Sequence, residues 1–364
     1  MKSPLTKSKR FTCKALGTNI FAPIAAISLL FGAVGCENIN QTVTPSSPVP
    51  VASNASPIAP VPVIANVSMR LPIPVVDTAF SPYYLAVDKG IFAKYGLNVK
   101  IEPGTPELNP VKMLAQGTDQ FAVLGGPEIL FSARSKGAQI VGTALLHKDA
   151  NFVTLLTLKK SQITKLSELE GKKVGFSFGH ISTDVLRMTF KKENVNVQES
   201  DVGFDYGQFI AGKLDAQWAF RTTAGLALPA KGVEVNFINP SDYGIVTQGH
   251  VVVTSEKMIK ENPKVVQAFN AAVLEAIAYS VEHPQEAIDA AVKRDPNFKK
   301  EVGQKQLEVY NAAIKKSSRI GDISEADMLK TKEQMLSVGL IPKEFDVKSA
   351  YTTQFVEQHY KGKS

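Results

Sequence analysis

The sequence predicts an α/β protein with parallel sheets, followed by a mostly helical C-terminal part. Two observations lead to this class. Between Ser68 and Val251, short apolar strands alternate with segments of helical patterning, an alternation typical of parallel sheets. After one last strand near Val251, almost every segment is helical. The chain shows no internal repeat of roughly 20 to 50 residues, so a solenoid or propeller is not expected.

The composition is that of a folded protein. The chain has 364 residues, of which 44% are hydrophobic and 21% charged, enough for two domains with sizeable cores. Its formal net charge of +7 would suggest nucleic acid or an anionic membrane as a partner, but five of the basic residues lie in the first 36, where there is no acidic residue. The remainder has 36 basic and 34 acidic residues, or +2, so no nucleic-acid partner is expected.

Residues 1–36 have the organisation of an export signal. A basic start, MKSPLTKSKR, precedes an apolar run from Ile20 to Val34. The tetrapeptide from Ala33 to Cys36 resembles the lipobox of bacterial lipoprotein signals, although Ala33 stands where leucine is usual. We therefore expect cleavage before Cys36 and lipid attachment to it. Ordinary secretion and a retained anchor are the alternatives, and the apolar run is short for an anchor.

The residues after this signal fit an exported, tethered domain. Residues 37–67 contain six prolines and almost no charge, which predicts an extended tether. Cys13 and Cys36 are the only cysteines, so the mature domain has no disulfide and no thiol chemistry. We expect the protein at the outer face of the inner membrane or the periplasmic face of the envelope.

Local patterning predicts the first strands and helices. Residues 69–76 are apolar and contain Pro72 and Pro74, which is tolerable in a strand near a sheet edge. Ser81-Pro82 joins a capping residue to a proline at the first helical position and predicts the start of the helix YYLAVDKGIFAKYG. Further strands are expected over 98–102, 121–124, 139–146 and 152–158, with helices over 107–116 and from Gly125-Gly126-Pro127 to Lys136.

The segment LSELEGKKVGFSFGHISTD, residues 166–184, gives the clearest local indication of a binding site. Residues 167–170 form one predicted helical turn and 172–177 a short strand, after which Gly179 opens a loop. Ser182 or Thr183 can cap the helix that continues to about Asn194. A strand that breaks at glycine and restarts as a capped helix leaves free backbone N–H groups at the carboxyl end of a sheet, where α/β proteins bind small ligands.

The rest of the chain completes this pattern. Helix faces rich in Lys and Glu near the C-terminus, as in LKTKEQML, indicate solvated surface rather than a partner. Strands are expected near 202–204 and over 215–220, 233–238 and 250–254, with helices over 209–212, up to Lys231, and over 262–282, 284–293, 300–317, 325–338 and 350–359.

Several segments together carry a family resemblance that spans about Arg70 to Val292. They are YYLAVDKGIFAKYGLNVKIEPG, MLAQGTDQFAVLGGPEILFSARSKG, LSELEGKKVGF, AGKLDAQWAF and SEKMIKENPKVVQAFNAAVLEAIAYSVEHPQEAI. In order and spacing they resemble the extracytoplasmic solute-binding proteins of ABC importers for sulfonate, nitrate and thiamine-pyrimidine precursors. The stretch INPSDYGIVTQGHVVVTSEKMIKENP is nearer to the thiamine-pyrimidine branch.

The resemblance implies a two-lobed periplasmic-binding fold of type II, with the ligand cleft between the lobes and a permease, with its ATPase, as partner. We place the two crossings near 157–161 and 239–249, so that lobe one is 68–157, lobe two is 158–245, and 246–364 returns to lobe one with the C-terminal helices. Fungal enzymes of this branch carry a cysteine-rich motif. The chain has no cysteine after Cys36 and is expected to be exported, which argues against that enzyme. We expect a monomer that binds its ligand without catalysis or cofactor.

The candidate ligand-binding residues stand near expected strand ends, which face the cleft in this fold. Aromatic side chains offer stacking for a flat heterocycle, although core packing is the alternative for each. Carboxylates can accept hydrogen bonds from an aminopyrimidine, whereas Arg221 could clamp an anion or form an inter-lobe ion pair. The predicted set is Asp77, Phe80, Tyr83, Tyr84, Gly125, Gly126, Glu128, Ser177, Phe178, His180, Ser182, Trp218, Arg221, Asp242 and Tyr243.

Two catalytic alternatives have weaker support. Residues 175–179, Gly-Phe-Ser-Phe-Gly, match the nucleophile elbow of serine hydrolases, and Asp242 with His250 or His283 could complete a triad. No His-Gly-Gly-Gly segment precedes them to form an oxyanion hole, so a hydrolase using Ser177 is a remote alternative. The five histidines show neither an HExxH motif nor metal-ligand spacing, and no metal site is expected.

The sequence therefore predicts a substrate-binding lipoprotein of an ABC importer that captures a small solute. A pyrimidine-like heterocycle is the first expectation for the ligand. Alkanesulfonate, taurine or nitrate is the second, supported by Arg221, and a flavin is among the remaining possibilities.

Overall fold

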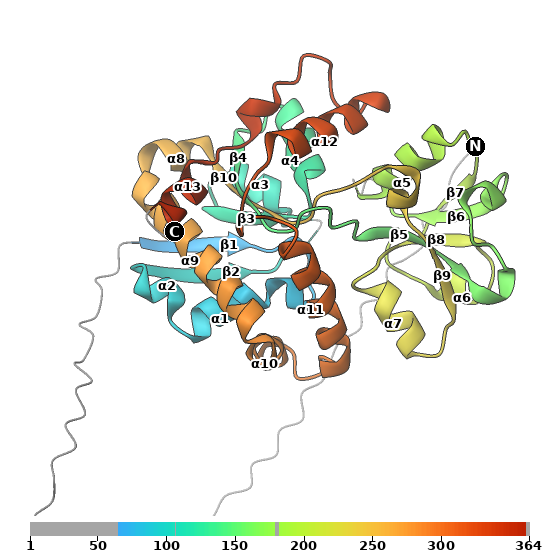
Figure 1. The fold of residues 1–364 in the computed structure, drawn as a ribbon, viewed down its shortest axis with the longest axis horizontal. Helices are drawn as coiled ribbons and strands as arrows, with labels where there is room; N and C mark the ends of the chain where they lie inside the picture. The colour runs from blue at the N-terminus through green and yellow to red at the C-terminus, as the bar shows by residue number, and fades with distance from the viewer. Residues whose placement is uncertain (1–64, 106, 179–181, 362–364) are drawn as a thin grey trace, which may run out of the picture. The chain divides into compact units, whose positions relative to one another are not determined.

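The computed structural model describes residues 65–105, 107–178 and 182–361. They form an α/β protein with two five-stranded sheets, and the part of the chain after the last strand is helical (Figure 1). The predicted signal, Cys36 and most of the predicted tether lie outside the described residues, as does His180.

The first sheet, called sheet A here, has the strand order β2-β1-β3-β10-β4. Strands β1, β2 and β3 are parallel, whereas β10 is antiparallel to both β3 and β4. The prediction of purely parallel sheets is therefore wrong for this strand. The strands of sheet A are β1 (Ala65–Arg70), β2 (Leu97–Glu102), β3 (Phe121–Leu124), β4 (Ile140–Leu145) and β10 (Val251–Ser255).

The second sheet, sheet B, has the order β7-β6-β8-β5-β9. Strand β5 runs antiparallel to β8 and β9 and so belongs to sheet B, which puts the first passage between sheets within 146–152 rather than near 157. The chain returns from β9 of sheet B to β10 of sheet A over 239–250. The strands are β5 (Val153–Leu158), β6 (Lys173–Phe176), β7 (Gln198–Asp201), β8 (Ala216–Phe220) and β9 (Val235–Ile238).

The helices before β10 connect the strands. Gly90, with φ of 69°, separates α1 from α2 where the sequence predicted one helix. They are η1 (Thr78–Phe80), α1 (Ser81–Asp88), α2 (Ile91–Lys94), α3 (Pro110–Ala115), α4 (Pro127–Ser135), η2 (Lys159–Ser161), η3 (Leu166–Leu169), α5 (Ser182–Lys192), α6 (Gly207–Ile210), α7 (Ala224–Ala230) and η4 (Pro240–Tyr243).

The C-terminal part is helical, as predicted. Its longest member, α9, starts with a proline in its first turn, and the serine before α12 caps that helix through its side chain. The elements are α8 (Glu256–Glu261), α9 (Pro263–Glu282), α10 (Pro284–Arg294), α11 (Lys300–Ile314), α12 (Glu325–Ser337), η5 (Val347–Ala350) and α13 (Gln354–Tyr360).

Two strands differ from their predicted positions. Strand β1 begins at Ala65, inside the predicted tether, and ends before Pro72, because its backbone pairs along its whole length with β2. Strand β7 lies over Gln198–Asp201 rather than 202–204, where it pairs with the edge of β6.

Each sheet is packed on both faces. In β3, Phe121 and Val123 enter a core with α1 and α9, whereas Ala122 and Leu124 enter a second core with α4 and α12. Sheet B has the same organisation, since Leu155 and Trp218 lie in one cluster while Leu156 lies in another. Burial on both faces explains why these strands are apolar throughout rather than alternating.

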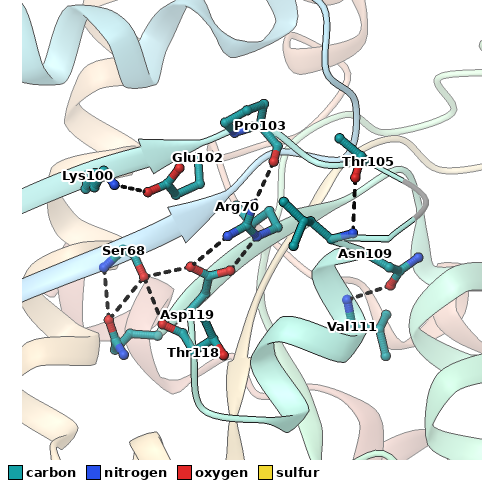
Figure 2. A network of polar contacts seen from close by, with 12 residues as sticks. Ser68, Arg70, Lys100, Glu102, Pro103, Thr105, Asn109, Val111, Thr118 and Asp119 are labelled. Carbon is teal, nitrogen blue, oxygen red and sulfur yellow. Dashed lines mark hydrogen bonds and ion pairs between the residues drawn. The ribbon is translucent and has the colours of Figure 1, made fainter. Parts of the chain in front are cut away.

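A buried ion pair joins β1 of sheet A to Asp119, two residues before β3. The Arg70 Nε donates to Asp119 Oδ2 at 2.5 Å, and a second guanidinium nitrogen donates to the backbone oxygen of Pro103 at 2.7 Å. Ser68 Oγ donates to Asp119 Oδ1 at 2.7 Å (Figure 2). The network holds the carboxyl end of β1 and the segment before β3 against the turn that follows β2.

Within residues 65–361, apart from the two gaps, no helix has both the length and the apolar character needed to cross a membrane.

Candidate functional site

The candidate site lies at one edge of sheet A. The carboxyl ends of β1, β3 and β4 meet there, and β10 starts at the same edge because it runs antiparallel. The chain leaves β1 toward β2 and leaves the neighbouring β3 in the opposite direction, toward β4, and such a reversal of strand order is where open α/β sheets bind ligands. The segments after β1 and β3 carry seven residues of the predicted set: Asp77, Phe80, Tyr83, Tyr84, Gly125, Gly126 and Glu128.

Five rings form a compact aromatic cluster at this edge. The His147 and His250 rings lie 5.1 Å apart, and Phe80 lies 5.2 Å from His250. Phe152, from the first passage between the sheets, lies 5.3 Å from His147, and Tyr310 of α11 lies 5.1 Å from Phe152. Residues from four distant parts of the chain thus form one buried aromatic cluster.

A chain of hydrogen bonds connects this edge to sheet B. Gln306 Nε2 of α11 donates to Asp77 Oδ2 at 3.1 Å and to the backbone oxygen of Thr222 at 2.8 Å. The Tyr310 hydroxyl donates to Thr222 Oγ1 at 3.0 Å. Thr222 follows β8, so these bonds hold α11 against the carboxyl end of a sheet B strand.

Two carboxyl groups at the edge have raised pKa values. Burial raises the pKa of Asp77 to about 6, although the Ala79 N–H bonded to it acts in the opposite direction. Burial raises the pKa of Glu128 to about 7. The two side chains differ in their bonding, because both Asp77 oxygens have partners while Glu128 Oε1 has none.

The two imidazoles are neutral at physiological pH. Burial lowers the pKa of His250 to about 4, and burial, with the neighbouring His250, lowers the pKa of His147 well below its ordinary value. A neutral imidazole can donate through one nitrogen and accept through the other.

Unsatisfied polar atoms gather in the segments that border the edge. Of nine buried side-chain atoms without a partner in the described part of the chain, five lie there: Ser81 Oγ, Tyr83 OH, Glu128 Oε1, His147 Nδ1 and His250 Nδ1. Ser81 does not cap α1 as predicted, because it is the first residue of the helix and its hydroxyl is free. Buried polar groups without partners are rare in folded proteins, so this concentration marks the edge as a candidate binding site.

The glycine before α4 allows the close approach that buries Glu128. A Cβ atom at Gly126 would lie 2.3 Å from Glu128 Oε2 and 3.3 Å from the backbone oxygen of Gln248. No side chain fits there without moving the carboxyl group, so glycine at this position is part of the site's geometry.

The edge of sheet B contributes further predicted residues. Phe178, 51% exposed, follows β6, and its backbone N–H donates to Asp201 Oδ1 at 3.1 Å. Ser177 and Ser182 are half-buried on either side of the loop. Arg221 follows β8 and is half-buried, and its guanidinium has no hydrogen bond or ion pair with any described residue.

Four predicted residues have structural partners instead. The Arg294 guanidinium lies 4.9 Å from the Tyr84 ring, and Trp218 Nε1 donates to the Gly203 oxygen at 2.8 Å inside the sheet B core. Asp242 is exposed and accepts from Asn239, while the Tyr243 hydroxyl accepts from the backbone N–H of Leu166 at 2.9 Å.

Sequence reasoning did not place His147, His250, Gln306, Tyr310 or Phe204 in a ligand site. The α11 pair is four residues apart on a helix whose position against the sheet edge depends on tertiary packing, so no local signal marks it. Phe204 is 56% exposed and lies 5.0 Å from Trp218, but the sequence placed it inside a strand predicted near 202–204, so its exposure could not be foreseen.

The catalytic alternatives find no support in the described residues. Neither a hydrogen bond from Ser177 to a histidine nor a grouping of His, Cys, Asp or Glu side chains fit for a metal ion occurs among them. The backbone oxygen of Ser177 accepts from Thr183, as in a structural turn.

The buried carboxyl of Glu128 makes a testable contribution to stability. Its pKa is about 7 when folded and 4.5 ordinarily, so its contribution to folding is fully present below pH 4.5 and is lost as pH rises to 7. We expect Glu128→Gln to match the parent at pH 4.5 and to be more stable by up to about 3 kcal/mol at pH 8. Urea denaturation of both proteins at the two pH values measures this difference.

Comparing Glu128→Gln with the parent cancels the effects of the other titratable groups at the edge, because both proteins contain them. The stability contributed by Asp77 is lost as pH rises, as for Glu128. The buried imidazoles act in the opposite direction, because they lower the stability of the protein as pH falls below 6.5. Glu286→Gln, at an exposed glutamate paired with Lys89, is the control and should show no gain at pH 8. Equal stability of Glu128→Gln and the parent at pH 8 would contradict the buried, unpaired state of this carboxyl.

Sequence comparison places the chain among known proteins. A sequence model of the family described as NMT1/THI5 like matches residues 77–287, more than half of the chain. The chain is 27% identical over 213 residues to the formylaminopyrimidine-binding protein of Halalkalibacterium halodurans, covering 57% of this chain and 64% of that protein, slightly under two thirds of its length. It is 24% identical over 294 residues to the riboflavin-binding protein RibY of Chloroflexus aurantiacus, covering 76% and 82%.

Enzymes and solved structures are also similar. The 4-amino-5-hydroxymethyl-2-methylpyrimidine phosphate synthase THI13 of Saccharomyces cerevisiae is 24% identical over 242 residues, covering 62% of this chain and 71% of the enzyme. The alkanesulfonate-binding protein SsuA of Xanthomonas axonopodis pv. citri superposes with a TM-score of 0.63 at 16% identity, covering 79% of this chain and 98% of that one. This likeness confirms the two-lobed periplasmic-binding fold that the sequence predicted.

Proposed function

Because this chain belongs to the NMT1/THI5-like family, we propose that it is the exported binding protein of an ABC importer and that it captures a pyrimidine-type heterocycle for delivery to a membrane permease. Attachment of the mature protein to the membrane through lipid on Cys36 is part of this proposal. The chain acts by binding and release, without catalysis.

One observation carries the proposal: five buried polar atoms without partners among the described residues, two of them on the clustered imidazoles, lie in the segments at the strand-order reversal of sheet A. A flat heterocycle can pack against the rings and supply donors and acceptors to Glu128 and the imidazoles. The loops after β6 and β8 would cover it from sheet B, through Ser177, Phe178, Ser182 and Arg221, with Phe204 nearby. The similarity to the formylaminopyrimidine-binding protein supports the same ligand class.

An anionic ligand is the second candidate. The half-buried Arg221 guanidinium, free of hydrogen bonds and ion pairs to the described residues, is suited to a sulfonate or nitrate. The buried carboxyls on the sheet A side favour the heterocycle, because an anion beside Glu128 offers no N–H donor to its oxygens, whereas an amino group does. A synthase activity has less support, since no cysteine follows Cys36 in this chain.

A thermal-shift screen of the purified protein tests the ligand class. We expect 4-aminopyrimidines to raise the melting temperature by several degrees, because a ligand at one hundred times its dissociation constant stabilises by about 2.7 kcal/mol. Riboflavin, alkanesulfonates, taurine and nitrate are the comparison ligands. A shift with sulfonates alone would replace the pyrimidine proposal by the anion candidate, and a shift with riboflavin alone would replace it by a flavin.

A further inference from the structure

The Glu128 side chain combines burial with an incomplete set of hydrogen bonds. It is 7% exposed, in the first turn of α4, directly after the glycine pair that ends β3. Its Oε2 folds back over Gly126, while Oε1 has no partner among the described residues. A buried carboxyl oxygen without a donor is costly, so the arrangement is explained by a ligand that supplies one.

Asp77 does not compete for this role. Its Oδ1 accepts from the Ala79 N–H at 2.8 Å and its Oδ2 from Gln306 Nε2 at 3.1 Å, so the local structure satisfies both oxygens. Glu128 is therefore the buried carboxyl at this edge that is left to meet a ligand.

The surroundings restrict the chemistry of that ligand. Gly126 lies against the backbone oxygen of Gln248, two residues before the His250 ring, and Leu124 pairs with Val251 in the sheet. A planar ring against the histidine cluster can therefore direct its edge toward Glu128. That edge must bear an N–H donor, and an amino group beside a ring nitrogen offers a donor together with a second hydrogen-bonding atom. A sulfonate or nitrate presents acceptors only, so it could meet the O–H of a protonated carboxyl but would leave its other oxygen without a donor.

Given the proposed function, we infer that Glu128 is the specificity-determining residue, whose carboxyl pairs with the amino group and adjacent ring nitrogen of an aminopyrimidine-type ligand. The pairing selects heterocycles with an amidine edge and rejects anionic solutes. In this pairing one carboxyl oxygen accepts from the amino group and the other, protonated, donates to the ring nitrogen. Oε1 has no partner among the described residues, and glycine at position 126 leaves room for Oε2.

The test combines two ligands with three proteins. Calorimetry measures the dissociation constants of 4-amino-2-methylpyrimidine and of 2-methylpyrimidine, which lacks the amino group. In the parent we expect the amino group to strengthen binding about 10- to 100-fold, the range of a hydrogen bond to a charged group. In Glu128→Met the two ligands should bind within about threefold of each other, while Glu128→Gln, which keeps one donor and one acceptor, should restore part of the preference.

The controls separate this role from a structural one. Glu286→Met alters an exposed glutamate of α10 and should keep the full preference for the amino ligand. Circular dichroism and urea denaturation establish that Glu128→Met is folded, as expected when an apolar side chain replaces a buried unpaired carboxyl.

The contrary outcomes differ for the two proposals. If the parent prefers the amino ligand and Glu128→Met keeps that preference undiminished, Glu128 does not read the amidine edge, although the pyrimidine-binding function stands. If the parent binds neither pyrimidine but binds riboflavin or an alkanesulfonate, the proposed ligand class is wrong and the role of Glu128 is overturned with it.

Discussion

Replacing Asp119 with alanine is expected to lower the free energy of unfolding by about 3–5 kcal/mol. The Arg70 and Asp119 side chains are 7% and 2% exposed, so removing the carboxylate leaves a buried guanidinium without its counter-charge. The Ser68 hydroxyl would also lose its acceptor at 2.7 Å and keep only the longer contacts to Thr118 and Gln120 (Figure 2). Urea denaturation followed by circular dichroism measures the loss.

Two further variants show that charge burial causes the effect. Lys100→Ala breaks an exposed pair with Glu102 on the same sheet and should cost at most about 1 kcal/mol. Arg70→Met combined with Asp119→Leu removes both charges and should recover most of the stability lost in Asp119→Ala. A loss below about 1 kcal/mol in Asp119→Ala would mean that water or another group compensates Arg70.

Elements with a strong local pattern could be predicted from the sequence. The apolar runs of β3, β4 and β5 were located within one residue at each end, because strands buried on both faces are apolar along their length. The helices α9 and α10 were located equally well, since Pro263 and Pro284 mark their first turns.

Pairing between distant segments could not be predicted in the same way. An apolar run such as β5 carries no information about which sheet it joins or in which direction, so its antiparallel position in sheet B was missed. Strand β7 has the sequence QESD and is mostly exposed, so it lacks any apolar signal; its strand conformation depends on its hydrogen bonds to β6.

The same distinction between local pattern and distant pairing applies to the residues of the candidate site. Glu128 and Asp77 could be proposed because each lies within a short segment that follows a predicted strand. The contribution of α11 could not, because Gln306 and Tyr310 reach the sheet edge only after the C-terminal helices pack. For aromatic residues at strand ends, sequence alone could not separate core packing from ligand contact, and Trp218 is the clearest example.

Replacing Trp218 with alanine is expected to lower the free energy of unfolding by about 3–5 kcal/mol, the range for emptying a large buried aromatic site. The side chain is fully buried in the core of sheet B, with Phe204 and Phe220 at ring distances of 5.0 and 5.3 Å. Thermal and urea denaturation measure the loss. Phe237→Ala, at a residue of β9 that is 39% exposed, is the matched control on the same sheet and should lose less than half as much.

Trp218→Phe distinguishes a core residue from a ligand contact. It keeps most of the apolar contact but removes the indole N–H that donates to the Gly203 oxygen, so we expect a smaller loss of about 1–2 kcal/mol. Because the indole is enclosed by the sheet B core, ligand affinity should stay within about twofold of the parent in this variant. A folded Trp218→Phe protein that binds its ligand tenfold more weakly would show instead that the ligand reaches the indole. The site would then extend from the sheet A edge into the core of sheet B, and Phe204, which covers the indole, would have to move aside when the ligand binds.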